Sequence, residues 1–127
     1  MTSPYVVIVE DNEDSATALS IMFSTSGYRV TVAHTATAAI AACRAASVDR
    51  GAVADLMLLD LSLPDADGLT VLAAATASGV APRVTVALTG HDDKQIAAAC
   101  RAAGCHDVLL KPVSLRHLIE QAKGWTK

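Results

Sequence analysis

Five short runs of apolar residues alternate along the chain with segments that have helical periodicity. Each run is continuous in hydrophobicity rather than alternating, which indicates strands that are covered on both faces, as in a parallel sheet. The predicted strands are residues 5–9, 29–33, 56–59, 84–88 and 108–110. This order predicts an α/β fold of five strand–helix units, with a doubly wound parallel sheet and helices on both of its faces.

The segments between the strands carry apolar residues at the spacing of amphipathic helices. The clearest sets are Ala36, Ala39, Ile40 and Cys43, then Ile96, Ala99, Cys100 and Ala103, then Leu115, Leu118, Ile119 and Ala122. Glycines that follow predicted helices, where a left-handed residue commonly ends a helix, are Gly27, Gly79 and Gly104. The predicted N-caps are Thr35 or Thr37, Asp92 and Ser114.

The composition narrows the classes of function. The length of 127 residues fits a single domain, residues 1–127, and we expect no second, output domain in it. A net charge of −3 and an aromatic content of 3% argue against a nucleic-acid-binding surface. We expect no signal peptide, and no stretch approaches the roughly 20 apolar residues of a membrane span. We therefore expect a cytoplasmic protein, whose cysteines are small buried residues without the spacing of a zinc site.

Polar residues stand at the carboxyl ends of four predicted strands, where ligands bind in sheets of this class. Glu10 and Asp11 follow the first strand, Asp60 the third, Thr89 and Gly90 the fourth, and Lys111 and Pro112 the fifth. Each feature alone also fits a solvated turn or a helix start. Together they are expected to bring carboxylates, a hydroxyl and an ammonium group to one edge of the sheet.

This set of groups suits phosphoryl transfer to a carboxylate. Asp60 is the candidate nucleophile, which would form an acyl phosphate. Asp11, Glu10 and Asp60 itself are candidate ligands for Mg²⁺, which prefers carboxylate oxygens, with Mn²⁺ as an alternative ion. The Thr89 hydroxyl and the Lys111 ammonium group would hold the oxygens of the transferred group.

Two further residues have predicted supporting roles at this edge. Gly90 would leave room for the approach of a phosphodonor. Pro112 would fix the loop that directs Lys111 inward, and a cis peptide bond is one way to do so.

Four motifs carry a resemblance to a known family. They are Val9-Glu10-Asp11-Asn12, the Leu-Asp-x-x-x-Pro-x-x-x-Gly stretch within residues 59–69, Leu88-Thr89-Gly90 and Leu110-Lys111-Pro112. With these motifs the chain resembles, over nearly its whole length, the response-regulator receiver domain, the phosphoacceptor module of bacterial two-component signalling. The resemblance implies a flavodoxin-like sheet with strand order 2-1-3-4-5.

The resemblance also implies a function. A histidine kinase or a histidine phosphotransfer protein would donate a phosphoryl group to Asp60 in the presence of Mg²⁺. The domain would promote its own dephosphorylation rather than act as a turnover enzyme. The backbone carbonyl of Ser62 would complete the metal site, and the side chains of Ser62 and His91 would tune the phosphate lifetime. A downstream protein would bind the face formed by the fourth helix, the fifth strand and the fifth helix.

One position departs from the family pattern. The family usually has Tyr or Phe three residues before the lysine, where this chain has Val108. This leaves open a pseudo-receiver, a protein-interaction module that is never phosphorylated. A phosphatase of the haloacid dehalogenase type is disfavoured, because its second Asp would stand where Ser62 does. A free-standing regulator, a phosphorelay shuttle and a segment of a hybrid kinase all remain open as settings.

Overall fold

The structure, a computed structural model, describes residues 3–127. Within this range five parallel strands form one sheet in the order β2-β1-β3-β4-β5. The strands are β1 (Tyr5–Val9), β2 (Arg29–Ala33), β3 (Leu56–Asp60), β4 (Val84–Thr89) and β5 (Asp107–Leu110). The helices are α1 (Glu13–Thr25), α2 (Ala36–Arg50), α3 (Gly68–Ala77), α4 (Lys94–Ala103) and α5 (Leu115–Trp125). The predicted fold class and strand order are confirmed.

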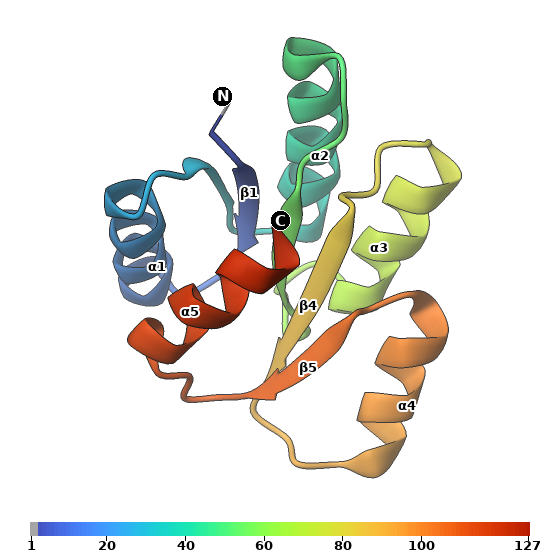
Figure 1. Ribbon diagram of the computed structural model, residues 1–127. Helices are drawn as coiled ribbons and strands as arrows, with labels where there is room; N and C mark the ends of the chain where they lie inside the picture. Colours follow the sequence, from blue (N-terminus) through green and yellow to red (C-terminus); the bar gives the residue numbers. More distant parts are fainter. Residues whose placement is uncertain (1–2) are drawn as a thin grey trace.

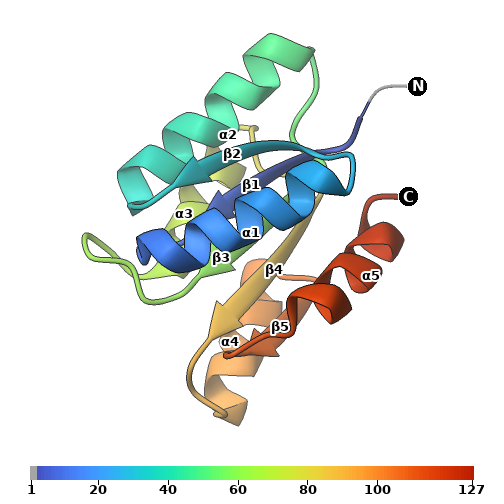
Figure 2. The ribbon, with the colours of Figure 1, turned by 90° about the vertical axis from the view of Figure 1, so that its left-hand side faces the viewer.

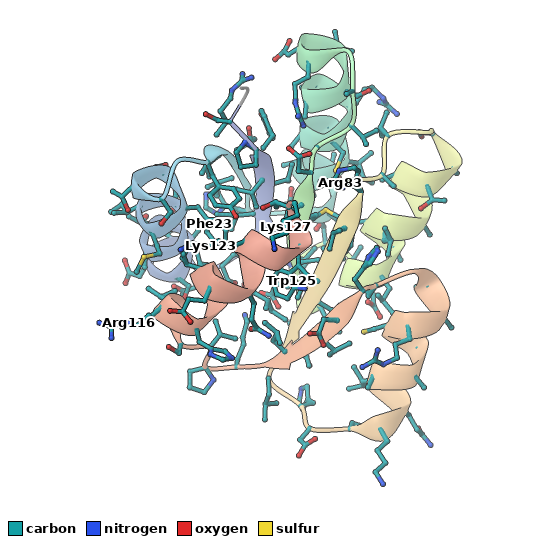
Figure 3. All side chains as sticks on the ribbon, in the orientation of Figure 1. Phe23, Arg83, Arg116, Lys123, Trp125 and Lys127 are labelled. Atoms are coloured by element: carbon teal, nitrogen blue, oxygen red, sulfur yellow. The ribbon has the colours of Figure 1, made fainter. Side chains whose placement is uncertain are left out.

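Helices cover both faces of the sheet. Figure 1 and Figure 2 show α1 and α5 on one face and α2, α3 and α4 on the other. Along β1, Val7 faces the α2–α3–α4 side and Ile8 faces the α1–α5 side, and both are fully buried. On the α1–α5 side, Phe23 (Figure 3) makes an edge-to-face contact with Tyr28, with ring centroids 4.9 Å apart. Burial on both faces explains why the apolar runs are continuous.

The helix starts agree with the sequence prediction except at α4. Thr35 caps α2 and Ser114 caps α5 with their side-chain oxygens. The prediction of Asp92 as the cap of α4 is wrong. Asp93 has the extended backbone of an N-cap, and its carboxylate accepts the N–H of Gln95 at 2.7 Å.

The predicted apolar face of α4 is confirmed only in part. Ile96 and Cys100 pack against the core, whereas Ala99 and Ala103 are exposed. The reason is that α4 lies beside the edge strand β5, so it covers only the border of the sheet (Figure 1). The glycines predicted to end helices all have positive φ angles, and Gly104 ends α4 with φ of 107°.

Two central strands extend one residue further than predicted. Asp60 is the last residue of β3 and pairs with Leu88, and Thr89 is the last residue of β4 and pairs with Leu110. Both residues were expected just after their strands, but they lie inside the ladder. Residues on a strand are held more accurately than residues on a loop, so this edge presents two well-positioned polar side chains.

The three cysteines are free and buried, as predicted. Burial raises the pKa of the Cys43 thiol to about 11 and that of the Cys105 thiol to about 12, so neither is a reactive thiolate at neutral pH. None of the described helices is long and apolar enough to cross a membrane.

Candidate functional site

The predicted site residues come together where four strands end, at the lower edge of the sheet in Figure 1. Glu10 directly follows β1, and its N–H donates to the Ala33 carbonyl at 3.0 Å. Asp60 and Thr89 end β3 and β4. Lys111 directly follows β5, and its N–H donates to the Thr89 carbonyl at 2.7 Å. The backbone of the sheet thus brings residues from both ends of the chain to one place.

Three carboxylates form a cluster at this edge. One oxygen each of Glu10, Asp11 and Asp60 lies within 4.8 Å of the others. Glu10 and Asp60 are buried, with only 3% and 2% of their surface exposed, whereas Asp11 is open to solvent. Carboxylates at such distances repel one another unless a proton or a cation lies between them.

Lys111 supplies one cation to this cluster. Its Nζ lies 2.9 Å from Oε1 of Glu10 and 3.2 Å from Oδ2 of Asp60. The Lys111–Pro112 peptide bond that directs the chain here is cis. The ammonium group contacts two of the three carboxylates, and the cluster has more carboxylates than ammonium groups.

The pKa values of the buried groups reflect this arrangement. Burial and the neighbouring Asp60 raise the pKa of Glu10 to about 7, although Lys111 opposes the shift. Burial also acts to raise the pKa of Asp60, but hydrogen bonds from Glu10 and Ser62 and the charge of Lys111 outweigh it and lower the value. Burial acts against the charge of Lys111, but the two carboxylates raise the pKa of its ammonium group. The pKa values of the two buried carboxyl groups therefore shift in opposite directions, that of Glu10 upward and that of Asp60 downward.

The backbone after β3 supports Asp60 at close range. The Ser62 N–H donates to Oδ1 of Asp60 at 2.9 Å. Gly68, at the start of α3, packs directly on the Asp60 backbone, and a Cβ atom there would lie 2.4 Å from the Asp60 carbonyl oxygen. No side chain fits at that distance, which explains the glycine eight residues after Asp60.

Thr89 lies beside the cluster rather than in it. Its side chain is buried, and its hydroxyl accepts the N–H of His91 at 3.1 Å. Within the described residues it makes no hydrogen bond to the three carboxylates. Thr89, His91 and Ser62 line a cavity of about 240 Å³ between the loops that follow β3 and β4. A Cβ atom at Gly90 would meet no described atom within 4 Å, so the backbone there borders open space.

Val108 occupies the position that usually has an aromatic residue in the family. It pairs with Ala87 of β4 and packs, half-buried, against the core on the α2–α3–α4 side. Two residues further on, Leu110 is 49% exposed at the end of the same strand. The side chain of Val108 ends at Cγ, so it offers no hydroxyl and no large ring to the Thr89 side of the strand.

Two residues that brace the site were not predicted from the sequence. Nδ1 of His34 lies 2.9 Å from the carbonyl oxygen of Glu10. The carboxylate of Asp65 accepts hydrogen bonds from the first turn of α2. Both contacts join segments more than 20 residues apart, and no local pattern indicates such pairs.

The family model described as response regulator receiver domain matches residues 6–123. This chain belongs to that family. The resemblance inferred from the four sequence motifs is confirmed.

This receiver domain has relatives among larger proteins. It is 35% identical over 123 residues to the sensory transduction protein RegX3 of Mycobacterium tuberculosis (strain H37Rv), a match that covers 97% of this chain and 50% of the relative. It is 32% identical over 119 residues to the TorCAD operon transcriptional regulatory protein TorR of Escherichia coli (strain K12), covering 94% and 48%. The chain thus spans about half the length of the curated relatives it matches.

Solved structures show the same fold. The signal receiver domain of a putative LuxO repressor protein from Vibrio parahaemolyticus is similar with a TM-score of 0.82 and 25% identity, covering 98% of this chain and 90% of that one. The agreement over almost the whole chain supports the arrangement of strands and helices described above.

Proposed function

We propose that this receiver domain accepts a phosphoryl group on Asp60 from the phosphohistidine of a histidine kinase or a histidine phosphotransfer protein. The observation that carries the proposal is the buried pair of Glu10 and Asp60 with Lys111 at the carboxyl ends of the strands. Asp60 is held in the ladder and bonded to the Ser62 N–H, and its surroundings lower its pKa, which are the properties of an oriented nucleophile.

In the transfer, one carboxylate oxygen of Asp60 forms a bond to phosphorus. The bond between phosphorus and the donor's imidazole nitrogen breaks, and the released imidazole keeps that electron pair and takes up a proton. Lys111 lies against the same carboxylate and is placed to neutralise charge on the phosphoryl oxygens. The Thr89 hydroxyl accepts from His91 and retains its own proton for a further acceptor, which we assign to a phosphoryl oxygen.

The cluster fits a divalent cation. Glu10, Asp11 and Asp60 offer hard oxygen ligands within 4.8 Å of one another, and a single ammonium group leaves negative charge to be neutralised. We propose that these residues and the Ser62 carbonyl hold Mg²⁺, with Mn²⁺ as a substitute. When bound, the ion supplies positive charge that stabilises the transferred phosphoryl group.

The remaining predicted residues receive supporting roles in the proposal. Gly90 borders open space beside Thr89 and leaves access for the donor. Ser62 and His91 line the same cavity as Thr89 and are positioned to influence the attack of water on the acyl phosphate. Pro112 fixes the backbone that directs Lys111 to the carboxylates.

In this function the domain is a stoichiometric switch. Residues 1–127 act as one receiver domain in the cytoplasm, which is phosphorylated once and promotes its own dephosphorylation. A downstream protein binds the face formed by α4, β5 and α5, and the domain itself makes no direct contact with nucleic acid. The switch between the two states is biased by the added charge.

One observation favours a second candidate, the unphosphorylated interaction module. Val108 cannot follow a movement of Thr89 as an aromatic ring would, and Thr89 makes no hydrogen bond to the carboxylates within residues 3–127. The phosphatase alternative stays disfavoured, because Ser62, at the position of its second Asp, has no carboxylate.

The test is intact-mass spectrometry of the wild type and of Asp60→Asn after incubation with acetyl phosphate or a phosphorylated histidine phosphotransfer protein. We expect one added phosphoryl group on the wild type with Mg²⁺, and none with EDTA or on the variant. A wild-type chain that gains no phosphoryl group from either donor would instead favour the interaction module.

A further inference from the structure

The loop between β3 and α3, residues 61–67, is bonded at its tip to the start of a different helix. Oδ1 of Asp65 accepts the N–H of Ala36 at 2.7 Å. Oδ2 of Asp65 accepts both the N–H and the hydroxyl of Thr37, each at 3.1 Å. One side chain thus makes three hydrogen bonds to the first turn of α2.

The base of the same loop is closed by contacts within the loop itself. The N–H of Gly68 donates to the Leu61 carbonyl at 3.0 Å, and Ser62 and Asp67 form an isolated antiparallel bridge. Asp67 caps α3 by accepting the N–H of Leu69. Among the side-chain hydrogen bonds of this loop in the described structure, those of Asp65 alone reach an element that does not adjoin the loop.

The contact suits a carboxylate. The first N–H groups of a helix have no hydrogen-bond partner within the helix. They lie at the positive end of the helix dipole, which favours an anion. Thr35 already serves the N–H of Ala38, so Asp65 satisfies the two N–H groups that remain before it. These N–H groups lower the pKa of Asp65, together with the Thr37 hydroxyl.

We propose that Asp65 is a positioning residue for phosphoryl transfer. By bonding the loop tip to α2, it holds the segment that carries the Ser62 carbonyl in the conformation that completes the metal site next to Asp60. The inference rests on the proposed function and adds to it a residue that touches neither metal nor phosphate. Ser62 stands three residues before Asp65 in the loop. Greater mobility of the loop tip would therefore also make the position of the Ser62 carbonyl less fixed.

The test compares Asp65→Ala with Thr35→Ala, a matched change at the same helix start. The Thr35 hydroxyl bonds within α2, so its loss weakens the helix cap without releasing the loop. Phosphoryl uptake from acetyl phosphate is measured by intact mass over a series of Mg²⁺ concentrations, and melting temperature is recorded for each variant. Asp65→Asn keeps one carbonyl oxygen and serves as the conservative variant.

We expect both alanine variants to melt at a lower temperature than the wild type. Only Asp65→Ala should need more Mg²⁺ for half-maximal uptake, roughly three- to tenfold more. Loss of a residue that directly supports a metal ligand typically weakens metal binding by about tenfold or more, and Asp65 acts on the Ser62 carbonyl from a greater distance. Asp65→Asn should fall between Asp65→Ala and the wild type.

Equal Mg²⁺ requirements for Asp65→Ala and the wild type would overturn the inference, and so would an equal shift in Thr35→Ala. A wild-type chain that takes up no phosphoryl group at any Mg²⁺ concentration would overturn the proposed function itself, and this inference with it. The wild-type measurement therefore separates the two failures.

Discussion

The two ends of the sheet both pair carboxylates with basic side chains, but in opposite proportions. At the carboxyl ends of the strands, Glu10 and Asp60 share the ammonium group of Lys111, and Asp11 adds a third carboxylate to the cluster. At the other end, one carboxylate, Asp55, is surrounded by donors. The same residue types therefore build two clusters with different charge balance.

The Asp55 cluster is fully satisfied. Its carboxylate lies 3.1 Å from Arg50 and 3.3 Å from Arg83, and it accepts the backbone N–H of Tyr5 at 2.8 Å. Arg83 is labelled at the upper end of β4 in Figure 3, opposite the edge where the strands end. Arg50 also lies over the Tyr5 ring, 5.6 Å from its centroid. These contacts join the end of α2 to the starts of β1, β3 and β4.

The two clusters differ in the charge that they leave unpaired, which suits the Asp55 cluster to a structural role and the Asp60 cluster to the proposed binding role. A carboxylate with two guanidinium groups and an N–H donor has no negative charge left to bind a cation. Three carboxylates with one ammonium group retain negative charge, which a proton or a further cation can neutralise. The excess at the Asp60 end is the physical basis of the proposed function.

The largest expected difference is between matched substitutions at the two ends. Asp60→Asn should abolish phosphoryl uptake, whereas Asp55→Asn should leave its rate within about twofold of the wild type. Asp55→Asn should instead lower the free energy of unfolding by about 1–3 kcal/mol, because it removes charged hydrogen bonds from a mostly buried group. Intact mass and urea unfolding measure the two effects. If Asp55→Asn lost phosphoryl uptake while keeping wild-type stability, the assignment of a structural role to Asp55 would be wrong.

Gly68→Ala tests how closely the Asp60 end is built. The added Cβ atom would lie 2.4 Å from the Asp60 carbonyl oxygen, so the backbone of β3 or α3 must move. We expect a loss of roughly 1–3 kcal/mol in unfolding free energy and slower phosphoryl uptake. Gly124→Ala, where a Cβ atom meets nothing within 4 Å of the described atoms, is the control. Equal behaviour of the two variants would show that the contact is not needed.

The excess of carboxylates should make stability depend on pH in the absence of metal. The pKa of Glu10 is about 7 in the folded chain, against an ordinary value of 4.5, so the folded state binds its proton more tightly. The stabilisation is complete below pH 4.5 and is lost as the pH rises through about 7. In EDTA we expect the free energy of unfolding to decrease by about 1–3 kcal/mol over this window.

Urea unfolding at a series of pH values measures this effect, and Glu10→Gln is the comparison. The variant cannot titrate at position 10, so its stability should change less over the same window. A variant that follows the wild-type curve would assign the pH dependence to other groups.

The smallest expected effect is that of a substitution in β4, between the two clusters. The Thr85 hydroxyl, inside β4, is buried and has no hydrogen-bond partner within the described residues. Thr85→Val should raise the free energy of unfolding by about 1 kcal/mol, because it removes a desolvated polar group at nearly constant volume. Phosphoryl uptake should not change. Denaturant unfolding checks the gain, and a loss of stability would indicate that the hydroxyl has a partner in solution.

The fold was predictable because two-sided burial leaves a direct trace in the sequence. A strand such as β1, covered on both faces, has to be apolar at every position, and its end is marked by the first acid, Glu10. Once parallel strands are assumed, the edge that gathers Glu10, Asp60 and Lys111 follows from topology alone. The family resemblance supplied the strand order.

Other features depend on contacts between residues far apart in the chain, which no local sequence pattern indicates. Asp65 is 28 and 29 residues from its partners, and Asp55 is 50 residues from Tyr5. The choice of Asp93 rather than Asp92 as a helix cap depends on backbone angles that two adjacent acids do not reveal. Neither the Asp55 cluster nor the Asp65 contact could therefore be inferred from spacing.

The most direct test of the central claim is a Mg²⁺ titration of the wild type, followed by the backbone amide signals in two-dimensional NMR. The account predicts saturable shifts at Glu10, Asp11 and Ser62, with little change at Arg50, Asp55 and Arg83. Shifts centred on Asp55, or none at either end at millimolar Mg²⁺, would contradict the claim that the uneven charge balance creates the metal-dependent site.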